Sequence, residues 1–293
     1  FNKEDIQQII VNSIRMMTTS PTQFSNPTKV MAALFYEPST RTQLSFTSAF
    51  YDLGGQVLSV VGQEASSPPK GESLWDTAKV IESYADVIVV RHPEIGAAKI
   101  MADATDIPVI NAGDGAGEHP TQAFLDMVTI KRECKKLDDL TISFVGDLKF
   151  GRTVHSLCYL LSNYNVKINL VSPTLLKLPE EIKNHLTSSK ISFEEFNSIE
   201  EVINKSNVLY MTRIQKERFS KNFAETFRSF YEKDKYTLTK KMAMLNEKMT
   251  IMHPLPRNNE LEKDIDSLPN AAYFRQATNG FWVRRALLEM ILE

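Results

Sequence analysis

The chain has 293 residues, of which 42% are hydrophobic and 24% are charged, and its formal net charge is −2. These values are typical of a globular protein with one large domain or two ordinary ones, and they exclude disorder, collagen and a long coiled coil. A nearly neutral chain argues against a nucleic-acid binder, and no apolar run reaches the roughly 20 residues of a membrane-spanning helix.

The first half of the chain alternates between helical spacing and short apolar runs. Its predicted elements are a helix over 2–17, a strand over 30–35, a helix to about 53, a strand over 56–61, a helix over 74–84, a strand over 87–90, a strand ending at 109–110 and a helix over 119–134. Such alternation favours a parallel sheet with helices on both faces.

The second half repeats this alternation after a polar break at 135–139. Its predicted elements are strands over 141–145, 168–171, 208–211 and 250–252, a helix ending near 164 and a final helix over 280–292. We interpret 216–250 as aperiodic, with a mobile loop and a helix. The pattern predicts an α/β protein of two doubly wound parallel-sheet domains, 1–135 and 136–276, with a terminal segment, 277–293, that packs back on the first.

The two cysteines, Cys134 and Cys158, lie far apart and lack the spacing of a metal site. We therefore expect reduced thiols, no disulfide scaffold and no metal. We also expect a cytoplasmic protein. Because the chain begins at Phe1, a targeting segment that is removed, or fusion to a longer polypeptide, stays open.

Residues that follow the predicted strands are unusually rich in anion-binding groups. In open α/β sheets, ligands bind beyond the carboxyl ends of strands, where helix N-termini present unpaired amides. Ser39-Thr40-Arg41-Thr42 follows the first strand and opens a helix. Three hydroxyls and a guanidinium at that point predict an oxyanion cradle. The alternative is an ordinary helix cap followed by a surface arginine.

Two histidines follow later strands of the first half. Arg91-His92-Pro93 ends one strand, and His119-Pro120-Thr121-Gln122 follows a glycine-rich loop, where backbone can approach a ligand closely. We interpret His119 as a functional residue. The alternative is a histidine that only satisfies structural hydrogen bonds.

Arginines also follow strands of the second half. Arg152 lies in a segment, 146–153, that nearly fits a phosphate-binding loop but has arginine in place of lysine, and Arg213 follows the strand over 208–211. With Arg41 and Arg91, four guanidiniums follow four different strands, which predicts ligands with several negative charges. The alternative is four solvated surface arginines.

Three motifs together resemble the carbamoyltransferase family. They are Phe35-Tyr-Glu-Pro-Ser-Thr-Arg-Thr42, His119-Pro-Thr-Gln122 and His253-Pro-Leu-Pro256. The segments beginning at Lys70, Arg91, Gly146 and Met211 resemble the aspartate branch of that family. The ornithine branch carries His-Cys-Leu-Pro and Ser-Met-Gly motifs, and neither occurs in this chain.

The resemblance implies transfer of a carbamoyl group from carbamoyl phosphate to L-aspartate, in pyrimidine biosynthesis, at a cleft between the two domains. It implies a carbamoyl phosphate-binding domain over 1–135 and an aspartate-binding domain over 136–276. The residues implied for carbamoyl phosphate are Ser39, Thr40, Arg41, Thr42, Ser66, Arg91, His119, Gln122, Pro254 and Leu255, and those for aspartate are Lys70, Arg152, Arg213 and Gln215.

For catalysis, the resemblance points to His119, Arg91, Thr42, Arg41 and Lys70. We expect His119 to donate a hydrogen bond to the carbonyl rather than to act as a base. No cofactor is implied. A homotrimer is implied, in which Lys70 and either Ser66 or Ser67 reach the neighbouring subunit's site. Whether a regulatory subunit binds stays open.

Three rival interpretations remain at the level of the sequence. The first is a nucleotide-binding protein that uses 146–153 as a phosphate loop, although no lysine is present. The second is a non-catalytic homologue that acts as a partner or scaffold. The third is a carbamoyltransferase with a different amine acceptor.

Overall fold

The computed structural model describes residues 1–19, 28–62, 71–230 and 233–293, and it divides into two compact units. The N-terminal unit comprises Glu4–Leu125 and Thr278–Glu293, and the C-terminal unit comprises Phe1–Lys3 and Asp126–Ala277. Each unit contains one parallel sheet, which confirms the predicted α/β class with two parallel-sheet domains. No helix in the described part of the chain is long and apolar enough to cross a membrane.

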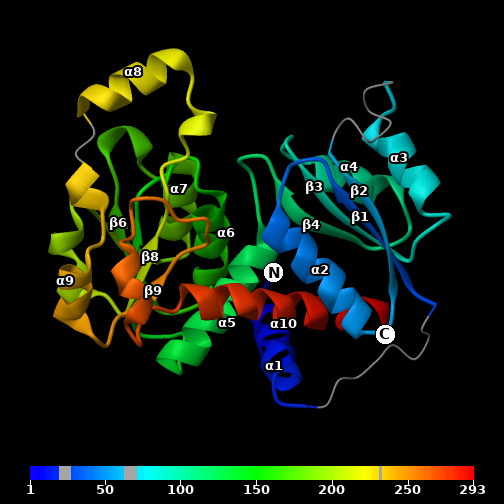
Figure 1. Cartoon of the computed structure of the whole chain (residues 1–293), viewed down its shortest axis with the longest axis horizontal. Helices are drawn as coiled ribbons and strands as arrows, with labels where there is room; N and C mark the ends of the chain where they lie inside the picture. Colours follow the sequence, from blue (N-terminus) through cyan, green and yellow to red (C-terminus); the bar gives the residue numbers. More distant parts are fainter. Residues whose placement is uncertain (20–27, 63–70, 231–232) are drawn as a thin grey trace. The chain divides into compact units, whose positions relative to one another are not determined.

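The N-terminal unit is built on a four-stranded sheet of order β2-β1-β3-β4 (Figure 1). Its strands are β1 (Val30–Phe35), β2 (Gln56–Val61), β3 (Val87–His92) and β4 (Val109–Asp114). The helices that contribute to it are α1 (Lys3–Met16), α2 (Thr40–Asp52), α3 (Leu74–Ile81), α4 (Ala97–Ala104), α5 (Pro120–Cys134) and α10 (Tyr273–Leu292). Helices α5 and α10 each continue from one unit into the other.

Alternate side chains of the central strands fill two apolar layers in this unit, because successive residues of a strand point to opposite faces. Met31 and Phe35 of β1 belong to a buried cluster with Phe46 of α2 and Leu288 of α10. Leu34, on the other face of β1, belongs to a second cluster, which contains residues of α3 and α4. The sheet is therefore covered on both faces, as a parallel sheet requires.

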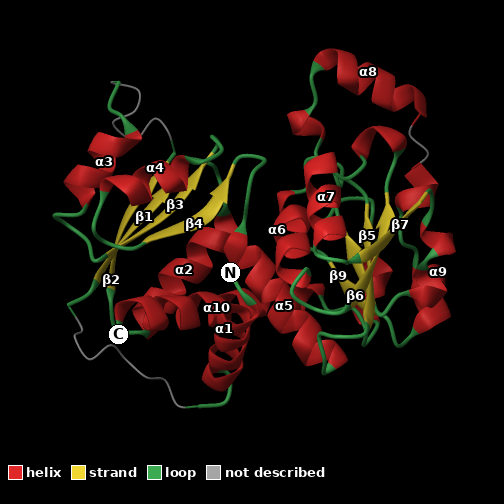
Figure 2. Cartoon of the chain, turned by 180° about the vertical axis from the view of Figure 1, so that it is seen from behind, coloured by secondary structure: helices red, strands yellow, loops and turns green. Residues whose placement is uncertain are grey.

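The C-terminal unit is built on a five-stranded parallel sheet of order β7-β6-β5-β8-β9 (Figure 2). Its strands are β5 (Leu140–Val145), β6 (Val166–Val171), β7 (Ser192–Phe196), β8 (Val208–Met211) and β9 (Thr250–Met252). Its α-helices are α6 (Arg152–Leu161), α7 (Glu180–Ser188), α8 (Lys221–Phe230) and α9 (Lys240–Ala243). Short 3-10 helices cover Thr174–Leu176, Ile199–Glu201, Ile203–Lys205, Lys216–Arg218, Lys233–Tyr236, Met244–Asn246 and Lys263–Ser267.

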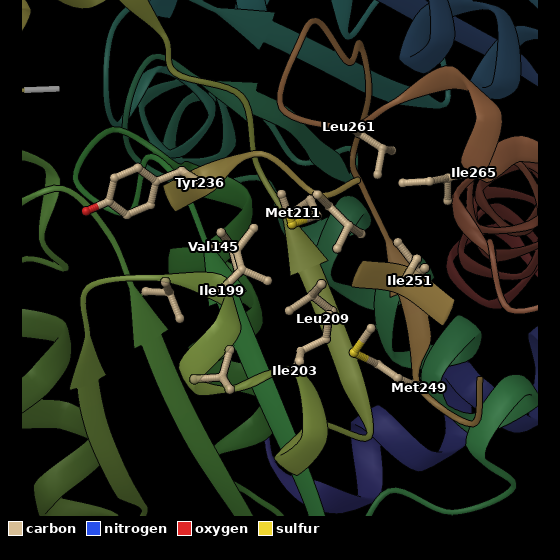
Figure 3. Packing of buried hydrophobic residues seen from close by; sticks show 14 of the residues in the cluster. Val145, Ile199, Ile203, Leu209, Met211, Tyr236, Met249, Ile251, Leu261 and Ile265 are labelled. Carbon is tan, nitrogen blue, oxygen red and sulfur yellow. The ribbon is translucent and has the colours of Figure 1, made fainter. Parts of the chain in front are cut away.

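One face of this sheet packs on the connections between its strands. Val145 of β5, Leu209 and Met211 of β8 and Ile251 of β9 form one buried cluster with apolar residues from those connections (Figure 3). Helices α6 and α7 lie on the opposite side of the sheet from α9 in both overall views. The strand ends of β5, β8 and β9 are thus fixed by a shared core.

Two sequence interpretations need correction in this part of the chain. The segment 216–250 is not aperiodic, because Phe219, Phe223 and Phe227 recur every four residues and pack together, with ring centroids 4.7 Å and 5.2 Å from Phe219. Such spacing places Phe223 and Phe227 on one face of α8, and Phe219, which precedes the helix, packs against both of them. The last helix also begins at Tyr273 and passes through Gly280, which lacks the side chain that would meet Arg284 and Leu125.

Gly146 is expected to be intolerant of any side chain. Its φ is +114°, and a Cβ atom there would lie 2.7 Å from Oγ1 of Thr212 and closer still to the Thr212 carbonyl. We expect Gly146→Ala to lower the free energy of unfolding by about 3 kcal/mol or more, from backbone strain and the clash together. Urea denaturation measures this loss.

The matched control for that variant is Gly96→Ala. Gly96 also has a positive φ, +84°, but a Cβ atom there meets nothing within 4 Å. Its loss is expected to be about 1–2 kcal/mol, the cost of the left-handed backbone alone. Equal losses for both variants would contradict the close approach at Gly146.

Candidate active site

The residues predicted to bind phosphate follow a central strand of the N-terminal sheet. Strands β1 and β3 are neighbours, and the chain leaves them toward opposite edges, so their carboxyl ends form a topological switch point. Ser39 is the N-cap of α2, yet its side chain makes no capping hydrogen bond. Thr42 is buried in the first turn of the helix, and Arg41 is exposed. Ser39 therefore occupies the N-cap position, but capping of the helix does not explain its hydroxyl group.

Arg91 ends the neighbouring strand β3, where it pairs in register with Phe35 of β1. Its guanidinium is buried and forms an ion pair with Glu37 at 3.0 Å. It also donates to the carbonyl of Ala112, in β4, at 3.3 Å. The solvated-surface interpretation is thus wrong for Arg91, which joins the ends of three strands.

His119 stands immediately before α5, and the amides of Gln122 and Ala123 bond to its carbonyl. Both His119 and Gln122 are buried. The loop before them is shaped by Asp114, whose carboxylate accepts from the amide of Glu118 at 2.6 Å and from that of Gly96 at 2.9 Å. The N-terminal unit thus provides hydroxyl, guanidinium and imidazole groups after β1, β3 and β4.

The C-terminal unit has its own switch point between β5 and β8. Val145 of β5 pairs with Met211 of β8, and the chain leaves these strands toward opposite edges. Arg152 follows β5 and begins α6, whereas Arg213 and Gln215 follow β8. The predicted aspartate residues therefore come from two adjacent strand ends.

Asp147 binds these two strand ends together. Its Oδ1 accepts from the amide of Phe150 at 2.9 Å, and its Oδ2 accepts from the amide of Gln215 at 3.1 Å. The side chain of Gln215 donates in return to the carbonyl of Phe150. Burial raises the pKa of the Asp147 carboxyl, although these backbone amides oppose that rise.

Thr212 makes a second link between the same two loops. Its hydroxyl donates to the carbonyl of Val145 at 2.9 Å and accepts from the amide of Asp147 at 2.9 Å. Both residues are buried, so these bonds are shielded from water. The backbone on either side of Arg213 is therefore firmly held.

Arg213 forms a two-pronged ion pair with Glu217, in which Nη1 lies 3.0 Å from Oε2 and Nη2 bonds Oε1. The hydrogen bonds that Arg213 donates to Glu217 raise the pKa of Arg213 and lower the pKa of Glu217. This guanidinium already has a geometry that binds a carboxylate. Arg152 is buried, so the surface-arginine interpretation is wrong for it as well.

His253, Pro254 and Leu255 follow β9, beside β8. Pro254 and Leu255 are half-buried, and Leu255 has a positive φ of 53°. Ser66, Ser67 and Lys70 lie outside the described residues. Among the described residues, no group of three or more His, Cys, Asp or Glu side chains could hold a metal ion.

Sequence reasoning missed four residues that support this site, namely Glu37, Asp147, Thr212 and Glu217. Glu37 and Asp147 lie within the quoted motifs, so their position after a strand was an available signal. Thr212 and Glu217 also flank Arg213 in a quoted segment. The bonds of Glu37, Asp147 and Thr212 could not be predicted, because they join different strand ends, whereas Glu217 lies only four residues from its partner Arg213.

Two family models match the chain, one over each half. The model for the aspartate/ornithine carbamoyltransferase carbamoyl-P binding domain matches residues 1–132, and that for the Asp/Orn binding domain matches residues 138–291. The chain therefore belongs to the aspartate/ornithine carbamoyltransferase family. This membership excludes the interpretation of 146–153 as the phosphate loop of a nucleotide-binding protein.

Similar proteins belong to the aspartate branch of the family. The aspartate carbamoyltransferase catalytic subunit of Thermoplasma volcanium is 48% identical over 293 residues, which is 99% of this chain and 94% of that protein. The solved catalytic subunit of M. jannaschii aspartate transcarbamoylase is 44% identical, with a TM-score of 0.90, over 100% of this chain and 95% of that one. The Trypanosoma cruzi enzyme in complex with N-(phosphonacetyl)-L-aspartic acid is 40% identical, with a TM-score of 0.90, over 100% and 94%.

Proposed function

We infer that this chain transfers the carbamoyl group of carbamoyl phosphate to the amine of L-aspartate. The products are N-carbamoyl-L-aspartate and phosphate, in an early step of de novo pyrimidine biosynthesis. One observation carries this inference: relatives at 40–48% identity, matched over 94–95% of their own length, are aspartate enzymes, one of them in complex with N-(phosphonacetyl)-L-aspartic acid.

The N-terminal unit is the proposed site for carbamoyl phosphate, within a domain over 1–135. Ser39, Thr40, Arg41 and Thr42 bind the phosphate, where the α2 N-terminus adds its amides and dipole. Arg91, His119 and Gln122 bind the carbamoyl group. The geometry that supports this role is the switch point between β1 and β3, with the buried Arg91 at its edge.

The C-terminal unit is the proposed site for aspartate, within a domain over 136–276. Arg152, Arg213 and Gln215 bind the two carboxylates, and the paired guanidinium of Arg213 supports this assignment. An incoming carboxylate takes the place that Glu217 occupies. The carbonyls of Pro254 and Leu255 accept from the carbamoyl amide and the attacking amine.

The reaction needs no nucleophile from the protein. The amine nitrogen of aspartate bonds to the carbamoyl carbon, the bond from that carbon to the phosphate oxygen breaks, and the departing phosphate takes the proton of the amine. Binding both substrates in alignment lowers the barrier by about 7 kcal/mol or more. His119, Arg91 and Thr42 donate to the developing oxyanion, and each donor contributes roughly 3 kcal/mol. Arg41 and Lys70 neutralise the phosphate.

The proposed assembly is a homotrimer, in which Lys70 and either Ser66 or Ser67 complete the neighbouring subunit's site. Exposed apolar side chains of the N-terminal unit support an interface there. They include Leu44, Tyr51, Leu58, Val61, Trp75, Val80, Tyr84, Ile95 and Ile100. Among them, Trp75, Val80 and Ile100 lie on α3 and α4, which pack against each other, and apolar groups exposed together are typical of surfaces that bind another protein. The mass of the protein in solution tests the proposed trimer. We expect three times the mass of the chain, and a monomer would contradict sites shared between subunits.

A colorimetric assay for carbamoyl aspartate tests the reaction itself. Carbamoyl phosphate is supplied with L-aspartate, L-ornithine and other amines in parallel. We expect turnover with aspartate alone. Product from another amine at a comparable rate would contradict the proposed acceptor, and no product at all would favour a non-catalytic homologue. The cytoplasmic location is a separate proposal, which cell fractionation tests.

A further inference from the structure

His253 is held in place at three points after strand β9. Its backbone amide donates to Oε1 of Gln276 at 2.8 Å. Its ring lies 2.8 Å from Oε1 of Glu260 through Nε2, and Nδ1 accepts from the amide of Leu255 at 2.8 Å. The residue is only 1% exposed, so no water competes for these bonds. His253 therefore joins the beginning of the loop after β9 to its end.

The bond to Leu255 fixes the direction of a carbonyl. The peptide between Pro254 and Leu255 is trans and planar, so its C=O points opposite to its N–H. Because that N–H points at the imidazole, the Pro254 carbonyl must point away from the ring. Proline has no N–H of its own, so the Leu255 amide is the nearest donor by which the loop can be held.

Leu255 needs such a restraint because its φ of 53° is unusual for a residue with a side chain. A backbone in this region persists only where its surroundings hold it, and such positions gather at functional sites. In this loop, the imidazole of His253 provides the bond. The same loop carries both carbonyls that we assign to the reacting groups.

The partners of the ring also fix its protonation state. Nδ1 accepts a hydrogen bond, so the proton of the neutral ring is on Nε2 and is donated to Glu260. Glu260 accepts from the amide of Asn258 through the same oxygen at 2.9 Å. Burial lowers the pKa of His253, although Glu260 opposes that shift. A protonated ring would set two donors against each other at Leu255.

A similar turn follows β3 in the N-terminal unit. There, Nδ1 of His92 accepts from the amide of Glu94 at 3.1 Å, across Pro93. Among the hydrogen bonds of the described residues, none joins the His92 ring to a carboxylate as Glu260 is joined to His253. The His92 ring instead packs against Tyr36, with a centroid separation of 5.3 Å. The His-Pro-x turn therefore occurs after two different strands of the described residues. The buried Glu260 and the strained Leu255 distinguish the turn after β9.

We propose that His253 is a positioning residue for carbamoyl transfer, which sets the carbonyls of Pro254 and Leu255 through the Nδ1 bond to the Leu255 amide. This proposal rests on the proposed function, which assigns those carbonyls to the carbamoyl amide and the attacking amine. His253 itself contacts neither substrate. Its effect is on alignment, to which transfer rates are sensitive.

Two substitutions separate this role from simple packing. His253→Ala removes the acceptor for the Leu255 amide, and we expect kcat to fall about 100-fold, the cost of a displacement of about 1 Å. His253→Asn is smaller than histidine but retains an acceptor, because an asparagine oxygen bonds the amide two residues on. We expect it to recover kcat to within about fivefold of wild type by restoring that turn.

The readouts are kcat, the aspartate KM, inorganic phosphate affinity and the melting temperature. Phosphate affinity should not change in either variant, because its proposed ligands lie in the other unit. His185→Ala is the matched control, since His185 bonds Ser162 in the same unit and is outside the proposed site. It should retain wild-type kcat.

Several results would overturn the role of His253. Wild-type kcat in His253→Ala would do so, and so would a folded His253→Asn that is as slow as the alanine variant. If His253→Ala does not fold, His253→Asn alone tests the proposal: a kcat near that of wild type supports the role of His253, and a large loss of kcat in the folded variant overturns it. A wild-type protein that forms no carbamoyl aspartate would instead refute the proposed function, and the melting temperature would still report on the fold of both variants.

Discussion

Replacing Arg213 with alanine is expected to raise the KM for aspartate about 100-fold. The guanidinium already holds the carboxylate of Glu217 by two hydrogen bonds, so its geometry suits a substrate carboxylate. A hydrogen bond to a charged group contributes about 1.5–3 kcal/mol, and each 1.4 kcal/mol corresponds to a factor of about ten in affinity. Steady-state kinetics at saturating carbamoyl phosphate measures the change.

Two comparisons sharpen this prediction. Arg213→Lys retains the charge but loses the planar fork, so its aspartate KM should lie between those of wild type and Arg213→Ala. Arg228→Ala removes an exposed arginine of α8 in the same unit and should leave the KM unchanged. An aspartate KM that is equally unaffected in Arg213→Ala would refute the assignment of Arg213.

Replacing His119 with alanine is expected to lower kcat about 100- to 1000-fold. A donor that stabilises charge only as the tetrahedral intermediate forms affects turnover more than substrate binding. His119 is buried, and its carbonyl caps α5, so the backbone hydrogen bonds at this position do not depend on the imidazole. Turnover at saturating concentrations of both substrates is the measurement.

The pattern of the loss distinguishes a donor from a base. If His119 only donates a hydrogen bond, His119→Gln should recover part of kcat, because glutamine retains an amide donor. If His119 acts as a general base, glutamine cannot replace it and kcat should stay as low as in His119→Ala. Full turnover in His119→Ala would contradict any catalytic role. The melting temperatures of both variants should stay close to that of wild type.

Most strands could be predicted because a buried parallel strand is a continuous apolar run between turn residues. The predicted strands over 30–35, 208–211 and 250–252 coincide with the buried strands β1, β8 and β9, and that over 56–61 coincides with β2, an apolar edge strand that is largely exposed. Strand β7 (Ser192–Phe196) was missed because it lies at an edge and its sequence, Ser-Phe-Glu-Glu-Phe, is largely polar. An edge strand needs little apolar surface, so composition does not reveal it.

Helices α4 and α7 were missed for a different reason. Each has only eight or nine residues, so few apolar positions are available to show helical spacing. In α4, the buried face consists of alanines and one methionine, which give a weak signal. Strand β4 was also predicted too short, because Asn111 to Asp114 resembled a loop although Val90 of β3 pairs with Asn111.

The sequence placed the candidate site residues after the correct strands, because motif position and strand ends coincide. It could not reveal how those strand ends are joined. The bonds of Asp147 to Gln215 and of Arg91 to Ala112 connect residues 68 and 21 positions apart. Such pairings depend on the strand order, in which β5 lies beside β8 and β3 beside β4, and strand order is a property of the folded chain.

The affinity for N-(phosphonacetyl)-L-aspartic acid tests the account most directly. This analogue carries a phosphonate and the two carboxylates of aspartate, so the proposed function predicts that its binding depends on the phosphate ligands assigned to one unit and on the carboxylate ligands assigned to the other. Calorimetric titration of Arg41→Ala and Arg213→Ala should each show at least about 100-fold weaker binding than wild type. Wild-type affinity in either variant would contradict the claim that strand-end arginines of both units bind the substrates.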